Sequence, residues 1–92
     1  MTPPPSPETI DRITGIVALY TSLRRIDPNA SLRGDLCLDD IDRAGIASDI
    51  SEDFGLDVSD HDLIEWETVE DIARTVEQLQ RLQPAFTQAR KD

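Results

Sequence analysis

The sequence predicts an all-α domain, a four-helix bundle with three longer helices and one short helix. Helix-start signals precede four segments, apolar residues recur within the longer ones at spacings of three and four, and no segment alternates as a β-strand does. The 92 residues suffice for one domain. Because only 4% of them are aromatic, the core must be aliphatic, and a deep catalytic cleft is hard to enclose in so small a domain.

The first predicted helix follows a stretch of four prolines. Met1–Pro7 is predicted to be a flexible or polyproline-like tail, and the helical domain is assigned to residues 8–82. Ser6 is a suitable N-cap, and Pro7 suits the first helical position. The apolar stripe and the basic residues that follow it predict a helix end around Leu23–Arg25.

A long loop over residues 26–38 should connect the first helix to the second. Its three leucines suggest that it is held on the core: Leu32, Leu36 and Leu38. The second helix should begin after Asp39, a good N-cap, and end at Gly55. Gly45 lies in the interior of this helix, where glycine costs about 1 kcal/mol relative to alanine.

Two further helices are predicted in the remainder of the chain. Ser59 can cap a short helical turn that runs to Ile64. Thr68 should open the last helix, whose apolar stripe reaches Leu82. Pro84 then stops it and leaves a polar tail over residues 83–92.

The net charge of −10 is concentrated in the middle third of the chain. Against Arg43 alone, residues 35–65 carry eleven acidic residues: Asp35, Asp39, Asp40, Asp42, Asp49, Glu52, Asp53, Asp57, Asp60, Asp62 and Glu65. Such a surface repels nucleic acid and anionic lipid and attracts basic protein surfaces. We therefore expect a protein partner and no nucleic acid.

Cysteine use and hydropathy indicate where the protein works. The single cysteine, Cys37, permits no internal disulfide and suits a reducing compartment. The N-terminus carries no basic-then-apolar signal, and no apolar run approaches the roughly 20 residues that a membrane span needs. A cytoplasmic monomer without a membrane span is expected.

Several motifs in register resemble the acyl carrier protein family. The run from Ala30 to Asp42 is similar to the family's segment that ends in an Asp-Ser-Leu-Asp motif, with Phe54-Gly55 fourteen residues past the serine position. Leu56–Asp60 and Thr68–Asp71 resemble the stretches that follow in the family. The match runs without a gap over some fifty residues, from Ala30 to about Leu79. It implies the family's four-helix fold and a carrier without catalytic activity of its own.

The resemblance breaks at the residue that matters most. In the family, a serine at the start of the second helix carries 4′-phosphopantetheine, and here that position is Asp40. Asp39 and Asp42 match the motif, and Ile41 is a conservative change. Since a carboxylate offers no hydroxyl to modify, Asp39, Asp40 and Ile41 mark a cofactor position that holds no cofactor as written. The cofactor 4′-phosphopantetheine is implied only if Asp40 replaces a native serine, and the sequence leaves both origins open.

The resemblance also implies a docking surface and an acyl pocket. The second helix of the family docks on basic patches of enzymes of fatty-acid, polyketide or related acyl metabolism, here through Asp42, Asp49, Glu52 and Asp53. The family's acyl chain lies between the second and third helices, and the matched positions are Ile50, Val58, Leu63 and Trp66. Plain core packing is the favoured role of these four residues.

Other chemistry finds little support in the sequence. Three carboxylates at 39, 40 and 42 attract cations weakly, but no calcium-type loop surrounds them, so no metal site is assigned. Neighbouring acids do not activate the Cys37 thiol and disfavour an acyl-carrying role. His61 lacks partners for a catalytic dyad. Three functions stay open: a docking module without an arm, a carrier whose serine was engineered to Asp40, and a regulatory helical domain unrelated to acyl transfer.

Overall fold

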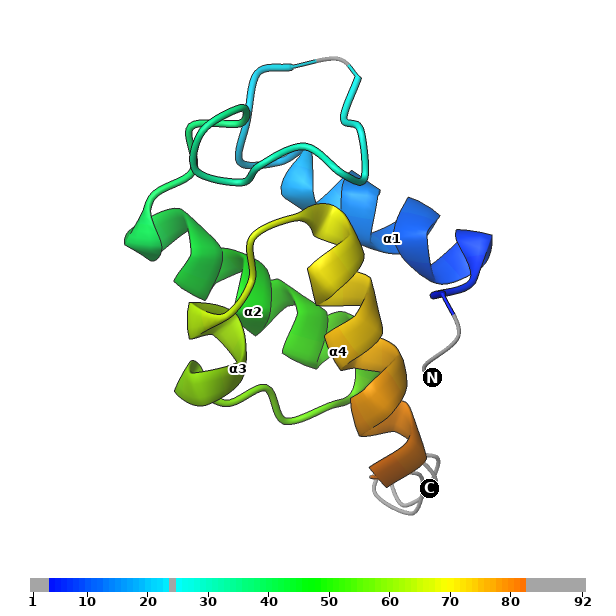
Figure 1. The fold of residues 1–92 in the computed structure, drawn as a ribbon. Helices are drawn as coiled ribbons and strands as arrows, with labels where there is room; N and C mark the ends of the chain where they lie inside the picture. The colour runs from blue at the N-terminus through cyan, green and yellow to red at the C-terminus, as the bar shows by residue number, and fades with distance from the viewer. Residues whose placement is uncertain (1–3, 24, 83–92) are drawn as a thin grey trace.

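Four helices form the whole of the regular structure that the computed structural model describes, over residues 4–23 and 25–82 (Figure 1). They are α1 (Pro7–Val17), α2 (Asp40–Phe54), α3 (Asp60–Ile64) and α4 (Val69–Leu82). Within these residues there is no strand, and the only β-type pairing is an isolated bridge between Ser31 and Thr68. The predicted all-α fold, with three longer helices and one short helix, is confirmed.

The start of α1 follows the predicted capping pattern. The Ser6 side chain accepts a hydrogen bond from the Thr9 backbone N–H, and Pro7 is the first helical residue. Of the tail predicted over 1–7, residues 1–3 lie outside the described range. Within the rest, Pro5 is buried and the Ser6 N–H donates to Glu77 on α4 at 2.9 Å.

The end of α1 differs from the prediction. The helix stops at Val17 and not near residues 23–25, because two tighter bonds close its last turn. The N–H groups of Leu19 and Tyr20 donate to carbonyl oxygens three residues back, at 3.0 and 2.9 Å. The chain then leaves the helix, and Tyr20 reaches across to α2.

Helices α2 and α3 begin and end where their caps predict. Asp39 and Asp42 form a reciprocal capping box at the start of α2, and Gly55 ends it in the left-handed conformation with φ of 68°. Ser59 and Asp62 form the same arrangement at α3. The predicted stop at Pro84 and the tail over 83–92 lie outside the described residues.

The long loop before α2 is held on the core, as its leucines predict. All three of them are buried: Leu32, Leu36 and Leu38. The Leu32 N–H donates to the Glu67 carbonyl at 2.8 Å, and the Glu70 N–H donates to the Pro28 carbonyl at 3.0 Å. In Figure 1 the cyan part of the loop accordingly passes beside the yellow start of α4. The loop and the α3–α4 connection therefore form one side of the α2 N-terminus.

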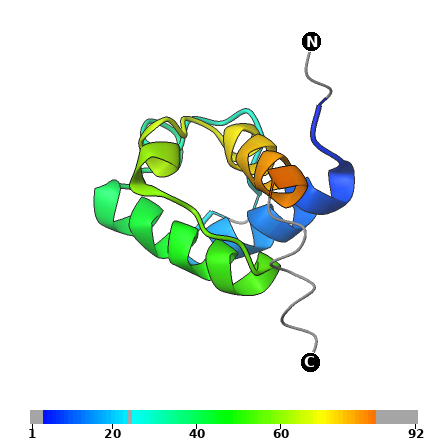
Figure 2. The ribbon, with the colours of Figure 1, turned by 90° about the horizontal axis from the view of Figure 1, so that it is seen from below.

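The core lies where α1 meets α2 and α4 (Figure 2). Its residues are almost all aliphatic, as the scarcity of aromatic residues requires. The helical residues with no exposed surface are Ile13, Val17, Ile46, Ile50, Val69, Ile72, Ala73 and Val76. None of the described helices has the length and apolar character to cross a membrane.

Candidate functional site

The candidate site lies at the N-terminus of α2, around Asp40. Asp40 is the first residue of the helix, and its side chain is 80% exposed. Its Oδ1 accepts a hydrogen bond from Nη2 of Arg43, one turn along the helix. Nη2 of Arg33, in the loop, lies 3.5 Å from the same oxygen. The Asp40 carboxylate therefore contacts two guanidinium groups, one from the loop and one from α2.

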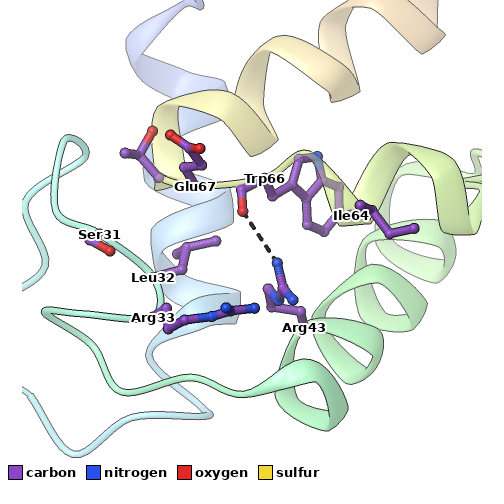
Figure 3. Close-up of a pocket in the computed structure, with 8 residues that line it drawn as sticks. Ser31, Leu32, Arg33, Arg43, Ile64, Trp66 and Glu67 are labelled. Atoms are coloured by element: carbon purple, nitrogen blue, oxygen red, sulfur yellow. Dashed lines mark hydrogen bonds between the residues drawn. The ribbon is translucent and has the colours of Figure 1, made fainter.

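Arg43 is the unusual member of this cluster, because its side chain is only 9% exposed. Its Nη1 donates to the backbone carbonyl of Trp66 at 3.4 Å, the bond drawn in Figure 3. Its Nε is buried and has no hydrogen-bond partner among the described residues. Because a buried charge is costly unless it is paired, Asp40 stabilises the position of Arg43.

A cavity with a volume of about 390 Å³ opens beside Arg43 (Figure 3). The loop, α2 and the α3–α4 connection each contribute to its wall. The lining residues are Ser31, Leu32, Arg33, Arg43, Ile64, Trp66, Glu67 and Thr68. The wall thus combines two arginines, two hydroxyls and an apolar side in a chain that is strongly acidic overall.

The three neighbouring carboxylates at the helix start have two structural roles, because two of them form the capping box and the third pairs with arginines. Asp39 accepts from the Asp42 N–H at 2.8 Å, and Asp42 accepts from the Asp39 N–H at 3.2 Å. The bond from the Asp42 backbone holds the pKa of the Asp39 carboxyl below its ordinary value. Asp40 faces the arginines instead. Among the described residues, no three potential metal ligands come together. Ile41 is 81% exposed beside this site.

Two of the four acids predicted for partner docking are bound to α1 or to the turn that follows it. Asp49 accepts a hydrogen bond from the Tyr20 hydroxyl at 2.7 Å. Asp53 pairs with Arg12 at 2.7 Å, and the Arg12 guanidinium also lies 4.1 Å from the centre of the Phe54 ring. Asp42 belongs to the capping box, and Glu52 is exposed with no bond to another described residue. Sequence reasoning did not identify these contacts.

The residues expected to line an acyl pocket lie in or against the core. Ile50 and Trp66 are buried in the core, and Val58 and Leu63 are partly buried and pack against that core. Trp66 lines the cavity beside Arg43, while Leu63 lines a separate, more open surface hollow with Arg33 and Asp40. The Trp66 Nε1–H donates to the Thr75 hydroxyl at 2.9 Å, which fixes the indole against α4.

The remaining candidates stand apart from one another. Cys37 is exposed in the loop, on the rim of a hollow that also includes Arg33 and Asp40. His61 is exposed on α3, with its Nε2 3.8 Å from the Glu65 carboxylate. Sequence reasoning missed Arg33 and Arg43. The spacing of Asp40 and Arg43, three residues apart on a helix, was the signal that could have revealed their pair.

The chain matches a protein-family model over most of its length. The family model described as PP-binding, phosphopantetheine attachment site, matches residues 11–76, which is more than two thirds of the chain. The matched range includes Asp40, both arginines of the site and most of α4. Domains of this family are carrier modules that normally hold 4′-phosphopantetheine. A search of curated proteins found no match to the chain.

Proposed function

Because the chain belongs to the phosphopantetheine attachment-site family, we propose that it is an acyl-carrier-like docking module that bears no phosphopantetheine arm. It works as a cytoplasmic monomer and has no catalytic activity. Its partners are enzymes of fatty-acid, polyketide or related acyl metabolism with basic docking surfaces. It would act on them as a scaffold, regulator or decoy.

The environment of Asp40 carries this proposal. A carboxylate cannot take up the arm, because the phosphodiester of the family forms on a serine hydroxyl. Asp40 is also matched to its surroundings, since it pairs with a buried arginine of its own helix and with Arg33 of the loop. A serine at this position would leave Arg43 without its carboxylate, at a cost in stability. This pairing favours a native aspartate at position 40 over a carrier whose serine was engineered to Asp40.

The docking surface proposed here is the exposed part of α2 with its flanks. Glu52 offers an exposed carboxylate with no bond to another described residue, Asp53 adds exposed negative charge, and Asp42 adds a partly exposed carboxylate. Ile41 and Ile64 supply apolar contacts on either side of the Asp40 cluster, and both are more than half exposed. Opposite charges on a partner enzyme raise the association rate, while the apolar residues hold the complex.

A transferase assay tests whether only the anchor is missing. The chain and an Asp40→Ser variant are each incubated with coenzyme A and a broad-specificity phosphopantetheinyl transferase, and their masses are compared. We expect the variant to gain one phosphopantetheine group and the parent to gain none. If neither gains it, α2 is not a transferase substrate, the docking proposal fails, and a regulatory role unrelated to acyl transfer is favoured.

Charge variants in the Asp40→Ser background test the docking surface. Glu52→Lys on α2 should lower kcat/KM for arm transfer about tenfold at low salt, and Asp11→Lys on α1 serves as the control with the same charge change. Arg12→Gln should raise kcat/KM, because it releases Asp53 from its ion pair. Equal losses from Glu52→Lys and Asp11→Lys would show that net charge, and not the α2 surface, governs the encounter.

A further inference from the structure

We infer that the cavity beside Arg43 binds a small organic oxyanion, a carboxylate or phosphate monoester with a short apolar portion. The inference concerns the wall of the cavity and does not depend on whether α2 docks on a partner. Three features of the wall support it: two arginines that share one carboxylate, unused hydrogen-bond donors, and an apolar side.

Positive charge exceeds negative charge at the Arg33–Arg43 end of the cavity. Two guanidinium groups share one carboxylate, that of Asp40. Arg33 is held loosely, because its side chain is 74% exposed and its nitrogen lies 3.5 Å from Asp40. Figure 3 shows the Arg33 side chain extended toward Arg43. A second anion between the two guanidiniums would balance the pair.

Donor groups in the wall are left unused by the protein. Nη1 and Nη2 of Arg43 already donate to Trp66 and Asp40, and its Nε is buried away from the cavity. The exposed Arg33 guanidinium contacts the described residues only through Nη2, 3.5 Å from Asp40, so its other N–H groups are available. The Ser31 hydroxyl accepts from the Gly34 N–H at 2.9 Å, which leaves its own hydrogen available. An oxyanion accepts several hydrogen bonds at once, and those from charged donors are the strongest.

The apolar side of the cavity selects for an organic ligand. Leu32, Ile64 and the indole of Trp66 line it, opposite the charged groups. A volume of about 390 Å³ is at the lower end for ligand sites, which limits the ligand to a few carbon atoms beyond its charged group. Burial of each methylene against this side contributes about 0.8 kcal/mol, so an alkylated anion should bind more tightly than a bare one.

Most of the acids behind the chain's net charge of −10 lie outside the cavity wall, although the carboxylates of Asp35 and Asp71 accept hydrogen bonds from backbone N–H groups of lining residues. Charges more than about 8 Å away are largely screened at physiological salt, whereas the two arginines lie in the cavity wall. Glu67 is the acid that lines the cavity, and it is exposed. Its neutralisation should therefore strengthen binding.

Fluorescence of Trp66 provides a direct readout, because it is the only tryptophan of the chain and lines the cavity. The protein is titrated with butyrate, propyl phosphate and inorganic phosphate at constant ionic strength. We expect a saturable change with at least one organic anion at a Kd of about 1 mM or tighter, and weaker binding of inorganic phosphate. The tighter of the two organic anions identifies the preferred charged group. Unsaturable changes with all three would overturn the proposal, and inorganic phosphate binding as tightly as both organic anions would overturn the role of the apolar side.

Exposed variants keep the test independent of folding. Arg33→Gln should raise the Kd about tenfold, and Glu67→Gln should lower it. Arg74→Gln is the matched control, because Arg74 is exposed on α4 and pairs with Glu70 and Asp71. Equal Kd values for the Arg33 and Arg74 variants would contradict a site at the arginine pair.

Discussion

Tyr20 lies directly against Gly45, where a Cβ atom would come within 2.8 Å of the Tyr20 hydroxyl oxygen. The same hydroxyl donates to Asp49, one helical turn further along α2. A glycine in a helix interior is unfavourable by itself, and here its lack of a side chain admits the ring. The end of α1 is thereby attached to α2.

We predict that Gly45→Ala destabilises the native protein although alanine favours the helix. The new methyl group displaces Tyr20 and breaks its bond to Asp49, which outweighs a propensity gain of about 1 kcal/mol. In a Tyr20→Ala background the methyl group meets no ring, so Gly45→Ala should stabilise by about 1 kcal/mol. Urea unfolding of the four proteins measures this cycle, and additive effects would contradict the contact.

Tyr20 should titrate above the ordinary tyrosine value. Its hydrogen bond to Asp49, with some burial and the negative charge of that carboxylate, raises the pKa of Tyr20 from 10.0. Since the pKa is higher in the folded state, the stabilisation is complete below about 10 and is lost as pH rises through the raised value. Tyr20 is the only tyrosine, so phenolate absorbance reports it directly. Asp49→Ala should return the midpoint toward 10.0, and an unchanged midpoint would count against the bond.

Glu77 on α4 stabilises the folded protein, and this stabilisation is lost at acidic pH. Hydrogen bonds from the Ser6 N–H and, more weakly, from the Thr9 hydroxyl lower the pKa of Glu77 from 4.5. A lowered pKa means that this stabilisation is present above about 4.5 and is lost as pH falls through the lowered value.

The Glu77→Gln variant tests this contact between α1 and α4. Its urea midpoint should lie below that of the parent at neutral pH, and the difference should shrink as the solution becomes acidic enough to protonate Glu77. Glu52→Gln is the matched control, because Glu52 makes no bond to another described residue, and its midpoint should not change. A difference for Glu77→Gln that persists unchanged into acid would contradict the assignment.

Cys37 holds a backbone conformation that suits another residue better. Its φ of 59° is left-handed, a region that asparagine adopts readily and β-branched residues avoid. Cys37→Asn should therefore stabilise the protein, and Cys37→Val should destabilise it by about 1 kcal/mol or more. Cys37→Ala controls for loss of the thiol. Thermal unfolding should rank the variants Asn, Ala, Val, and a reversed order would exclude backbone strain.

Local signals predicted most of the fold. Ser6, Asp39 and Ser59 cap the helices that they were expected to cap, and Gly55 ends α2, because these effects involve neighbouring residues only. The predicted end of α1 was wrong because the apolar stripe, which includes Tyr20, continues past Val17 in the sequence. Two tighter bonds close the helix after Val17, and Tyr20 then contacts Gly45 and Asp49 on α2, which no local pattern reveals.

The candidate site was predictable only in part. The position of Asp40 at a helix start followed from its cap, whereas the burial of Arg43 depends on the Trp66 carbonyl, 23 residues away. The acids on α2 were predicted from the sequence as one docking series. Asp49 is hydrogen-bonded to Tyr20 and Asp53 is paired with Arg12, and because these contacts join distant residues, the two acids could not be separated from Glu52 by sequence.

The contact between Ser6 and Glu77 joins residues 71 positions apart in the chain, and this has a consequence for synthesis. Most helical bundles fold quickly because their contacts are local. Here α1 contacts both α2 and α4, so a growing chain cannot complete its core until Val69 and the residues after it have been made. Folding therefore remains incomplete until the last helix has been synthesised. The chain is most prone to aggregation before that point.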